Sequence, residues 1–279
     1  MSMQFATRRY RRTAFVARLR RFLASVGSGT ISGLQRLLLY LSLAATVLVV
    51  ALRRSTWAPP VRAEFRRLLD QVAVRSLATT AATGLLVGFA LVSQAVYWLA
   101  QTGTTGLVGP VIVVLLVREL VPILVGLILF GRSGTATLIE LGEAHTRGWL
   151  RLFEIQGLDP LAMLVMPRAI AFALGSFCVA TTLLLSTLLT GYVMAHALGL
   201  ISYSIQDFRD LVLRAMDPSD FVIPPLKCLT IGFAVALSCC ATGLGRHDEG
   251  DELQRLVPRG FVRSALAIFA VNGFFDLAI

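Results

Sequence analysis

The residues most able to take part in specific chemistry are a cation and an anion side by side, Arg118 and Glu119, inside a long apolar stretch. No other charged residue occurs between Ser76 and Gly131. A charge within a membrane-length apolar segment is costly unless a partner satisfies it, so such residues mark structural contacts or transport pathways. The position of this pair is therefore informative about function.

Side chains that could perform bond chemistry are scattered through the rest of the sequence. The histidines, His145, His196 and His247, lie far apart, and the four cysteines occur inside apolar segments without the spacing of metal ligands. No phosphate loop of the G-x-x-x-x-G-K-[ST] type is present. We therefore expect this chain not to be an enzyme and to bind no metal and no cofactor itself.

The composition predicts a protein that resides in a lipid bilayer. Hydrophobic residues make up 56% of the 279 residues and charged residues only 15%, whereas soluble domains are usually about a quarter charged. The formal net charge of +10 could suggest nucleic acid, but the arginines cluster beside the apolar runs, which is the pattern of membrane topology. We expect no nucleic-acid partner.

The apolar runs predict an all-α integral membrane protein with one permease-sized domain, residues 33–279, after a basic cytoplasmic segment, residues 1–32. Each crossing needs about 20 apolar residues. Five runs are long enough, at about 76–100, 107–131, 166–199, 221–245 and 261–279. A shorter run, Leu37–Leu52, has arginines at both ends and fits an interfacial helix, with a tilted full span as the alternative.

Charge also predicts the orientation of these segments. The N-terminal segment has seven arginines and no acidic residue before residue 22, so we expect it in the cytoplasm. The polar segment at residues 202–220 has four aspartates against two arginines and should be external. With five crossings, the C-terminus should lie on the outer side of the membrane.

Residues 132–160 form the richest polar stretch between the apolar runs, and orientation places them in the cytoplasm. We expect the second span to end at Gly131 and Arg132, and an amphipathic helix to run from about residue 145 to 156. One face of that helix would carry Trp149, Leu152, Phe153 and Gln156. Such a helix either lies on the inner leaflet or docks on a partner protein, and its pattern alone leaves both open.

The stretch from residue 118 to 168 resembles the signature of the MlaE (YrbE) permeases, the membrane subunits of ABC transporters that move lipids across the bacterial envelope with MCE proteins. The family pattern joins Arg-Glu-Leu-Gly-Pro, Gly-Arg-x-Gly, Ala-Glu-Leu-Gly, Glu-x-x-Gly-x-Asp-Pro and a final Pro-Arg. The matching residues here are Arg118, Glu119, Leu120, Pro122, Gly131, Arg132, Gly134, Glu140, Leu141, Gly142, Glu154, Gly157, Asp159, Pro160, Pro167 and Arg168. Upstream, Gly84, Gly88 and Gln94 resemble the first span of the family.

The sequence departs from the family pattern at several points. Val121 stands in place of a glycine and Ile139 in place of an alanine. The segment AHTRGWLRLF replaces the threonine-glutamate-glutamine segment, and GRHDEGDELQRLVPRG lacks the usual valine-glycine-alanine pattern. These departures leave the partner ATPase and the transported lipid unspecified.

The resemblance implies a fold, a location and partners. It implies an MlaE-type permease in the bacterial inner membrane, with its N-terminus cytoplasmic and its C-terminus periplasmic. The implied partners are a second copy of the chain, separate ABC ATPase subunits that bind the ATP, an MCE-domain protein and a lipid substrate. Such a permease would move phospholipid or a related lipid between the inner membrane and the outer envelope.

The resemblance also assigns candidate site residues. The polar region 132–160 would contact the ATPase through Glu140, Glu143, Arg147, Trp149, Arg151, Glu154 and Asp159. Candidates for the intramembrane or lipid pathway are Arg118, Glu119 and Gln94. Arg118 and Glu119 would either hold adjacent helices in register or contact a lipid headgroup.

Two functions of other classes stay open. A membrane scaffold without transport activity would keep the fold and lose the ATPase contacts, and the altered segment after Glu140 is compatible with that function. A secondary carrier independent of an ATPase should show ion-coupling carboxylates, unwound helix pairs and repeated halves, which are mostly absent from this sequence.

Overall fold

The computed structural model describes residues 38–53, 56–103, 108–199, 204–245 and 253–278. These residues form helices and turns without any strand, and the chain divides into two compact units, Met1–Thr46 and Val47–Ile279. The basic segment 1–32 lies outside the described residues. An apolar helix at Leu38–Leu52 is shorter than a helix that spans a bilayer, and its placement in the interface stays a prediction.

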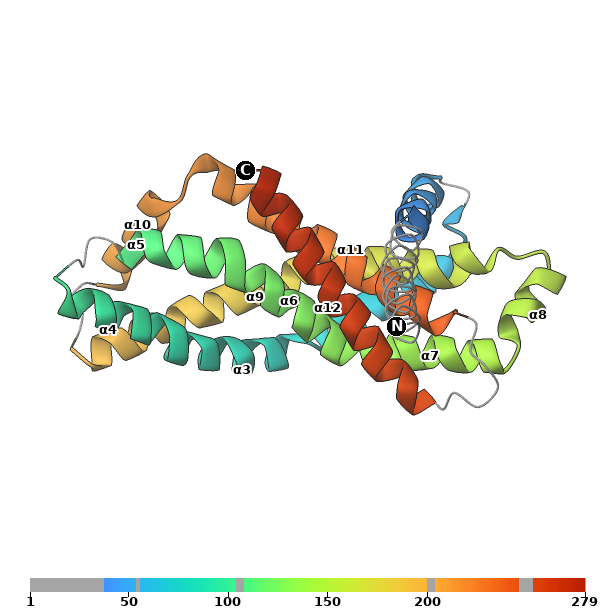
Figure 1. Ribbon diagram of the computed structural model, residues 1–279, viewed down its shortest axis with the longest axis horizontal. Coiled ribbons are helices and arrows are strands. Elements are labelled where there is room, and N and C mark those ends of the chain that lie inside the picture. Colours follow the sequence, from blue (N-terminus) through green and yellow to red (C-terminus); the bar gives the residue numbers. More distant parts are fainter. Residues whose placement is uncertain (1–37, 54–55, 104–107, 200–203, 246–252, 279) are drawn as a thin grey trace, which may run out of the picture. The chain divides into compact units, whose positions relative to one another are not determined.

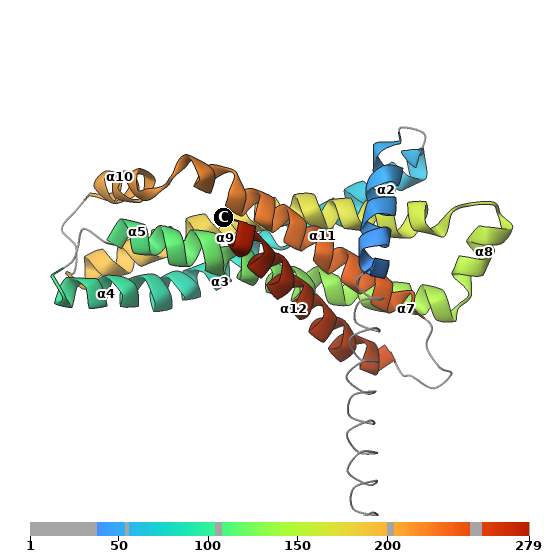
Figure 2. The ribbon, with the colours of Figure 1, turned by 45° about the horizontal axis from the view of Figure 1, so that its top comes forward.

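Five helices in the described part of the second unit are long and apolar enough to cross a membrane. They are Pro59–Leu99, Gly109–Thr146, Leu161–Ala197, Pro218–Gly243 and Leu256–Leu277. Figures 1 and 2 show these helices packed along one another, with the C-terminal helix running obliquely across the others. The predicted all-α membrane fold, with a shorter apolar helix before five longer ones, is confirmed.

The first long helix combines an amphipathic lead-in with an apolar span. Its lead-in, α2 (Pro59–Leu69), begins with two prolines, which are tolerated because the first N–H groups of a helix have no intrahelical partner. α2 buries Val61 and Leu68 and exposes arginines on its other side. The helix continues through the π-helical turn η2 (Asp70–Val74) and α3 (Leu77–Val87). A second π-helical turn, η3 (Gly88–Val92), then leads into α4 (Ser93–Gln101).

The second long helix runs well beyond its predicted end at Gly131 and Arg132. It consists of α5 (Val108–Ile112), η5 (Val113–Leu120), α6 (Val121–Leu129), η6 (Phe130–Gly134) and α7 (Thr135–Thr146). Gly131 does not adopt the positive φ with which a glycine ends a helix. In addition, Leu138 and Leu141 are fully buried in α7, so packing favours continuation of the helix.

The predicted amphipathic helix at 145–156 is divided in the structure. Gly148 has a φ of 73° and Gly157 a φ of 70°, and both therefore end a helix as only glycine does readily. Between them lies the short helix α8 (Trp149–Ile155). The polar region is thus an extension of the second long helix followed by a turn and α8, as the right-hand end of Figure 1 shows.

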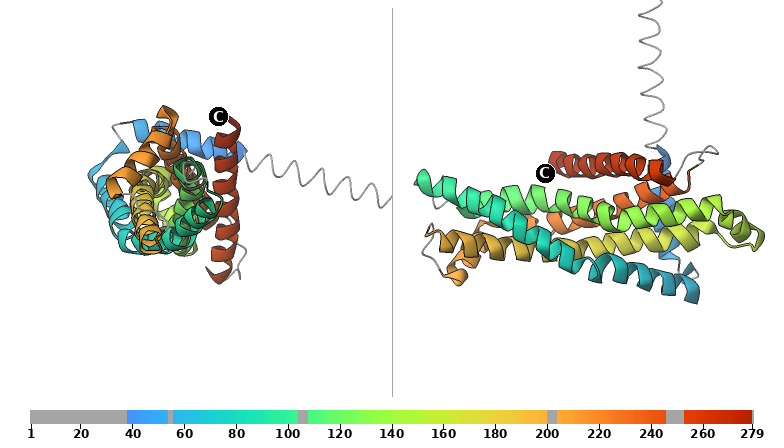
Figure 3. Two further views of the ribbon diagram at one scale, coloured as in Figure 1. Left: turned by 90° about the vertical axis from the view of Figure 1, so that its left-hand side faces the viewer. Right: turned by 90° about the horizontal axis from the view of Figure 1, so that it is seen from below.

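The core of the second unit is formed around α9 (Met166–Ala197), which follows the π-helical turn η7 (Leu161–Val165). α9 packs against α3 and α11 (Ile223–Gly243), and α11 packs in turn against α12 (Leu253–Ala278). A Cβ at Gly232 would lie 2.5 Å from the carbonyl oxygen of Phe172, so a glycine there allows α9 and α11 to approach closely. The end-on view of Figure 3 shows α12 lengthwise at one side of the other helices.

The acidic segment between the third and fourth long helices is itself helical. α10 (Ile205–Ala215) starts at a capping box formed by Ser204 and Asp207, and η8 (Pro218–Phe221) follows it. α10 buries Phe208 and Val212 and packs against α5. It lies at the same end of the helices as α4 and α5, as Figure 1 shows.

Candidate functional site

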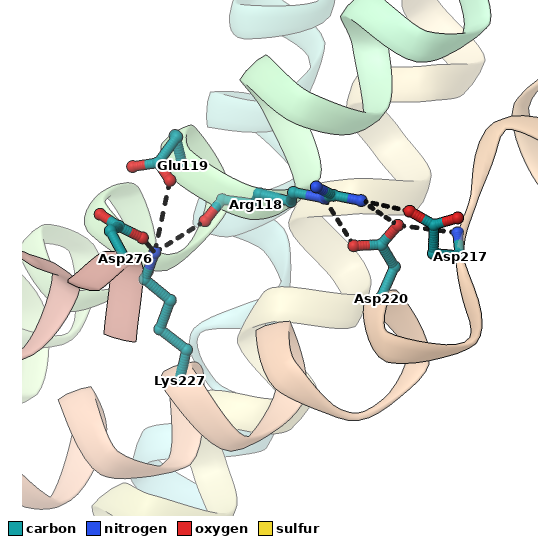
Figure 4. Close-up of polar contacts among 6 residues, drawn as sticks. All are labelled: Arg118, Glu119, Asp217, Asp220, Lys227 and Asp276. Carbon is teal, nitrogen blue, oxygen red and sulfur yellow. Dashed lines mark hydrogen bonds and ion pairs between the residues drawn. The ribbon is translucent and has the colours of Figure 1, made fainter. Parts of the chain in front are cut away.

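Arg118 binds two aspartates that follow α10 in the chain (Figure 4). Its Nε donates to Asp220 Oδ1 at 2.6 Å, and its Nη2 donates to Asp220 Oδ2 at 2.8 Å. The same Nη2 donates to Asp217 Oδ2 at 3.1 Å. The Asp220 side chain is only 4% exposed, so this two-point contact fixes η8 against the second long helix by a strong charge-assisted pair.

Glu119 belongs to a second set of contacts, centred on Lys227 of α11 (Figure 4). Lys227 Nζ lies 2.6 Å from Asp276 Oδ1 and 3.5 Å from Glu119 Oε1, and it donates to the backbone oxygen of Arg118 at 3.0 Å. Asn272 Nδ2 donates to Glu119 Oε2 at 2.8 Å and to Asp276 Oδ2 at 3.0 Å. The lysine side chain is 2% exposed, and it joins α11 to η5 and α12.

Arg118 and Glu119 therefore hold different neighbours rather than each other. Successive residues of a helix point about 100° apart, so the two side chains reach different elements. Both residues lie nearer to α5 than to Arg132 in the second long helix. These contacts support the alternative that the pair holds adjacent helices in register. A contact with a lipid headgroup stays a prediction.

The six residues drawn in Figure 4, here called the central cluster, are unequal in charge: Arg118, Glu119, Asp217, Asp220, Lys227 and Asp276. Two cations face four carboxylates, which gives a formal charge of −2 with every group ionised. The Glu119 and Asp276 side chains are each 38% exposed. An exposed carboxylate at membrane depth needs water or protein beside it, so this side of the cluster is not suited to face hydrocarbon.

A second network, here called the Arg168 quartet, lies at the other end of the long helices: Glu64, Arg67, Glu140 and Arg168. Arg168 Nη2 lies 3.0 Å from Glu140 Oε2 and 3.6 Å from Glu64 Oε1. Arg67 Nη2 lies 2.8 Å from Glu64 Oε1 and 3.5 Å from Glu140 Oε2. Positive and negative groups alternate, and they connect α2, α7 and α9.

Among the predicted ATPase contacts, Glu140 is thus engaged inside the chain. Its partner Arg168 is 5% exposed, and removing a partner from a buried cation is costly. The carboxylate of Glu140 therefore contributes to the position of α7 against α9. A direct contact with another protein is not needed to explain this residue.

The other predicted contacts lie on or beside α8. Arg147 Nη2 lies 3.2 Å from Glu143 Oε2, one helical turn away, and Trp149 and Arg151 are exposed. Asp159 Oδ1 accepts a hydrogen bond from the backbone N–H of Leu161 at 3.0 Å, which caps the helical turn before α9. The side chain of Glu154 lies outside the described residues.

Gln94 does not join either network. It lies on α4, where its side chain is exposed, and it has no hydrogen bond to another part of the chain that the structure describes. Its assignment to a lipid pathway stays a prediction.

Sequence reasoning did not identify most partners in the two networks. The contacts around Arg118 and Glu119 are completed by Asp217, Asp220, Lys227, Asn272 and Asp276. The contacts around Glu140 are completed by Glu64, Arg67 and Arg168. Lys227 carried a usable signal, because it is a charged residue within an otherwise apolar run. Asp276 carried the same signal in the last apolar run, whereas Asp217 and Asp220 carried none, since they occur in a polar segment.

The networks are suited to holding helices and not to bond chemistry. Their side chains are carboxylates paired with cations, and the four cysteines are free. Among the residues that the structure describes, no group of three His, Cys, Asp or Glu could hold a metal ion.

Comparison with known proteins gives one family match and several relatives. Residues 65–278 match the family model described as Permease MlaE. A probable ABC transporter permease protein of Synechocystis is 28% identical over 206 residues, which cover 74% of this chain and 78% of that protein. The intermembrane phospholipid transport system permease protein MlaE of Haemophilus influenzae is 30% identical over 113 residues, 39% of this chain and 43% of that protein.

A further relative is a plant protein. The chloroplastic protein TRIGALACTOSYLDIACYLGLYCEROL 1 of Arabidopsis thaliana is 27% identical over 214 residues, which cover 74% of this chain. The match spans 60% of the length of the Arabidopsis protein.

Proposed function

The chain belongs to the MlaE permease family, and from this membership we propose that it is the membrane subunit of an ATP-driven transporter of phospholipid or a related lipid. The family match over residues 65–278 carries this proposal, and it confirms the resemblance seen in the sequence motifs. The five membrane-length helices and relatives named as ABC transporter permeases support it. ATP would bind to a separate ATPase subunit, and an MCE protein would receive or deliver the lipid.

The surface of α8 is the proposed contact with the ATPase. The side chains of Trp149, Leu152 and Ile155 are 50%, 53% and 76% exposed, and they lie on a short helix at the end of the second long helix. Large apolar side chains left exposed beside polar ones are typical of a protein contact. α7 would transmit a movement of α8 to the Arg168 quartet and so to α9.

Orientation follows from that assignment. If α8 faces the cytoplasm, the end that carries α10 faces the periplasm, and the C-terminus lies on that outer half. This agrees with the arginines of α2, which the Arg168 quartet connects to α7, and with the aspartates near α10. The direction in which lipid moves is not specified by these charges.

A second copy of the chain is proposed to cover the exposed side of the central cluster. Glu119 and Asp276 are partly exposed on two of the membrane-length helices, where carboxylates need water or protein. A symmetric pair of permeases would enclose these groups in a shared, hydrated cavity between the copies. Such a cavity would form the lipid pathway.

The test is purification of the full chain from its native membranes, followed by identification of the proteins that accompany it. We expect an ATPase with a phosphate loop and an MCE-domain protein to copurify. Leu152→Asp on α8 should abolish recovery of the ATPase, while the control Val222→Asp, an exposed apolar residue at the α10 end, should retain it. Equal recovery with both variants would contradict the α8 assignment, and absence of any ATPase would favour the scaffold.

A further inference from the structure

An apolar groove of about 610 Å³ lies between α9, α10 and α11. This volume is within the range of roughly 300–1,000 Å³ that is usual for small-molecule sites. Figure 1 shows α10 at the same end of the molecule as the final turns of α9. The groove lies within one copy of the chain, so it does not depend on an interface between copies.

The groove is long as well as apolar. On α9 its lining runs from Phe177 to Tyr192, a distance of about 22 Å at ~1.5 Å of rise per residue. α10 forms the facing wall with Phe208 and Val212, which are each 5% exposed. A long, narrow apolar wall of this kind fits an extended hydrocarbon chain better than a compact ligand.

The charges that border the groove are already compensated. Asp220, at the end nearest α11, is held by Arg118 through two hydrogen bonds. At the other end Arg209 donates to Asp210 Oδ1 from Nε at 2.9 Å and from Nη2 at 2.8 Å. Between these two ends the lining residues carry no charge, which disfavours a charged group in the middle of the groove.

The start of α10 provides a polar end to this apolar wall. Gln206 and Arg209 line the groove and are exposed. The Nη1 of Arg209 has no hydrogen bond to another residue that the structure describes, so it is available to donate to a phosphate oxygen. This polar end complements an anionic headgroup attached to an apolar chain.

The groove also has a side that a lipid can enter. Leu185 and Leu189 line it and are 64% and 54% exposed. Both lie on α9, within the apolar, membrane-length helix Leu161–Ala197. An acyl chain can therefore reach the groove laterally without passing through the interior of the protein.

We propose that this groove binds one acyl chain of a phospholipid, with the phosphate headgroup at Gln206 and Arg209. The groove is lined by residues of one copy, whereas the proposed pathway lies between two copies. It requires neither ATP nor a partner subunit. A lipid held there would keep α10 against α9.

The experiment uses the full chain in nanodiscs that contain phosphatidylglycerol with a photoactivatable diazirine in one acyl chain. After illumination, digestion and mass spectrometry, we expect the label to concentrate on residues 177–192 of α9 and 205–216 of α10. Leu185→Trp and Leu188→Trp, tested separately, should each lower this labelling by about fivefold or more because the indole fills the groove.

Leu174→Trp is the matched control. Leu174 is also an exposed leucine of α9, lies eleven residues before Leu185 and so on nearly the same face, and does not line the groove. Its labelling should equal that of the unmodified chain. Thermal unfolding of all variants shows whether they are folded.

Two results would overturn the proposal. One is label spread evenly over all membrane-facing helices, which is the result for bulk bilayer lipid. The other is equal labelling of the folded Leu185→Trp, Leu188→Trp and Leu174→Trp chains. Because no nucleotide or ATPase is present, either result leaves the proposed transport function untouched, and loss of the ATPase contact would likewise leave the groove unaffected.

Discussion

The central cluster and the Arg168 quartet both join helices by ion pairs, yet they differ in balance and exposure. The quartet has two arginines and two glutamates in alternation, and its central cation Arg168 is 5% exposed. The central cluster has two cations and four carboxylates, with Glu119 and Asp276 each 38% exposed. The quartet thus satisfies its own charges, whereas the cluster leaves an acidic side open.

This difference indicates two tasks. A balanced network fixes helices to one another, because each group has its partner within the chain. An unbalanced one with exposed carboxylates needs a hydrated cavity or a second protein beside it. Under the proposed function, the quartet would transmit movement from α8, and the cluster would border the lipid pathway.

The largest effect is expected from removal of the buried lysine of the cluster. Lys227→Met would leave Glu119 and Asp276 without their cation, and breaking a buried pair from one side costs about 3–5 kcal/mol. Thermal unfolding in detergent should show a large loss of stability. Adding Glu119→Gln and Asp276→Asn should recover most of it, and an unfolding temperature unchanged by Lys227→Met alone would contradict the role of the lysine.

A smaller effect, still within the cluster, separates its two aspartates on Arg118. Asp220 is 4% exposed and makes two hydrogen bonds to the arginine, while Asp217 is 71% exposed and makes one. We expect Asp220→Asn to cost about 2–3 kcal/mol and Asp217→Asn less than about 1 kcal/mol. Denaturant unfolding measures both, and equal losses would show that burial does not determine the strength of this contact.

The quartet should show a measurable coupling between its two central residues. Glu140→Gln, Arg168→Gln and the double variant form a cycle, and we expect a coupling free energy of about 1–2 kcal/mol because the partners are in direct contact. Unfolding of the four proteins gives this value. A coupling near zero would mean that the quartet does not connect α7 to α9.

The smallest effect is expected at the exposed pair beside α8. Glu143 and Arg147 are 45% and 64% exposed, so Arg147→Ala should change the free energy of unfolding by less than about 0.5 kcal/mol. Under the proposed function the same variant should nevertheless weaken copurification of the ATPase. A large loss of stability would contradict this expectation and show that Arg147 stabilises the fold, as the residues of the Arg168 quartet do.

Much of the fold could be predicted because lipid imposes a simple rule on sequence. Long apolar runs, such as those that contain α9 and α11, form helices across the bilayer because lipid leaves backbone groups no other partners. The number and order of the long helices followed from composition and local pattern. Gly131 misled because a glycine marks a helix end only where its φ is positive, and sequence does not state φ.

The partners in the charge networks could not be predicted, since they are far apart in the chain. Arg118 and Asp220 are separated by 102 residues, and Glu119 and Asn272 by 153. No periodicity connects such positions, and only the packing of η8, α11 and α12 against the second long helix brings them together. Sequence could identify Arg118 and Glu119 as unusual, but not the direction in which each side chain points.

The central claim, that ATP hydrolysis on a partner moves lipid through this permease, is tested most directly by transport in proteoliposomes. The full chain is reconstituted with the proteins that copurify with it, and movement of a fluorescent phospholipid to an acceptor is measured. The account predicts movement that requires ATP and falls to background with Leu152→Asp. Movement at the same rate without ATP, or with that variant, would contradict it.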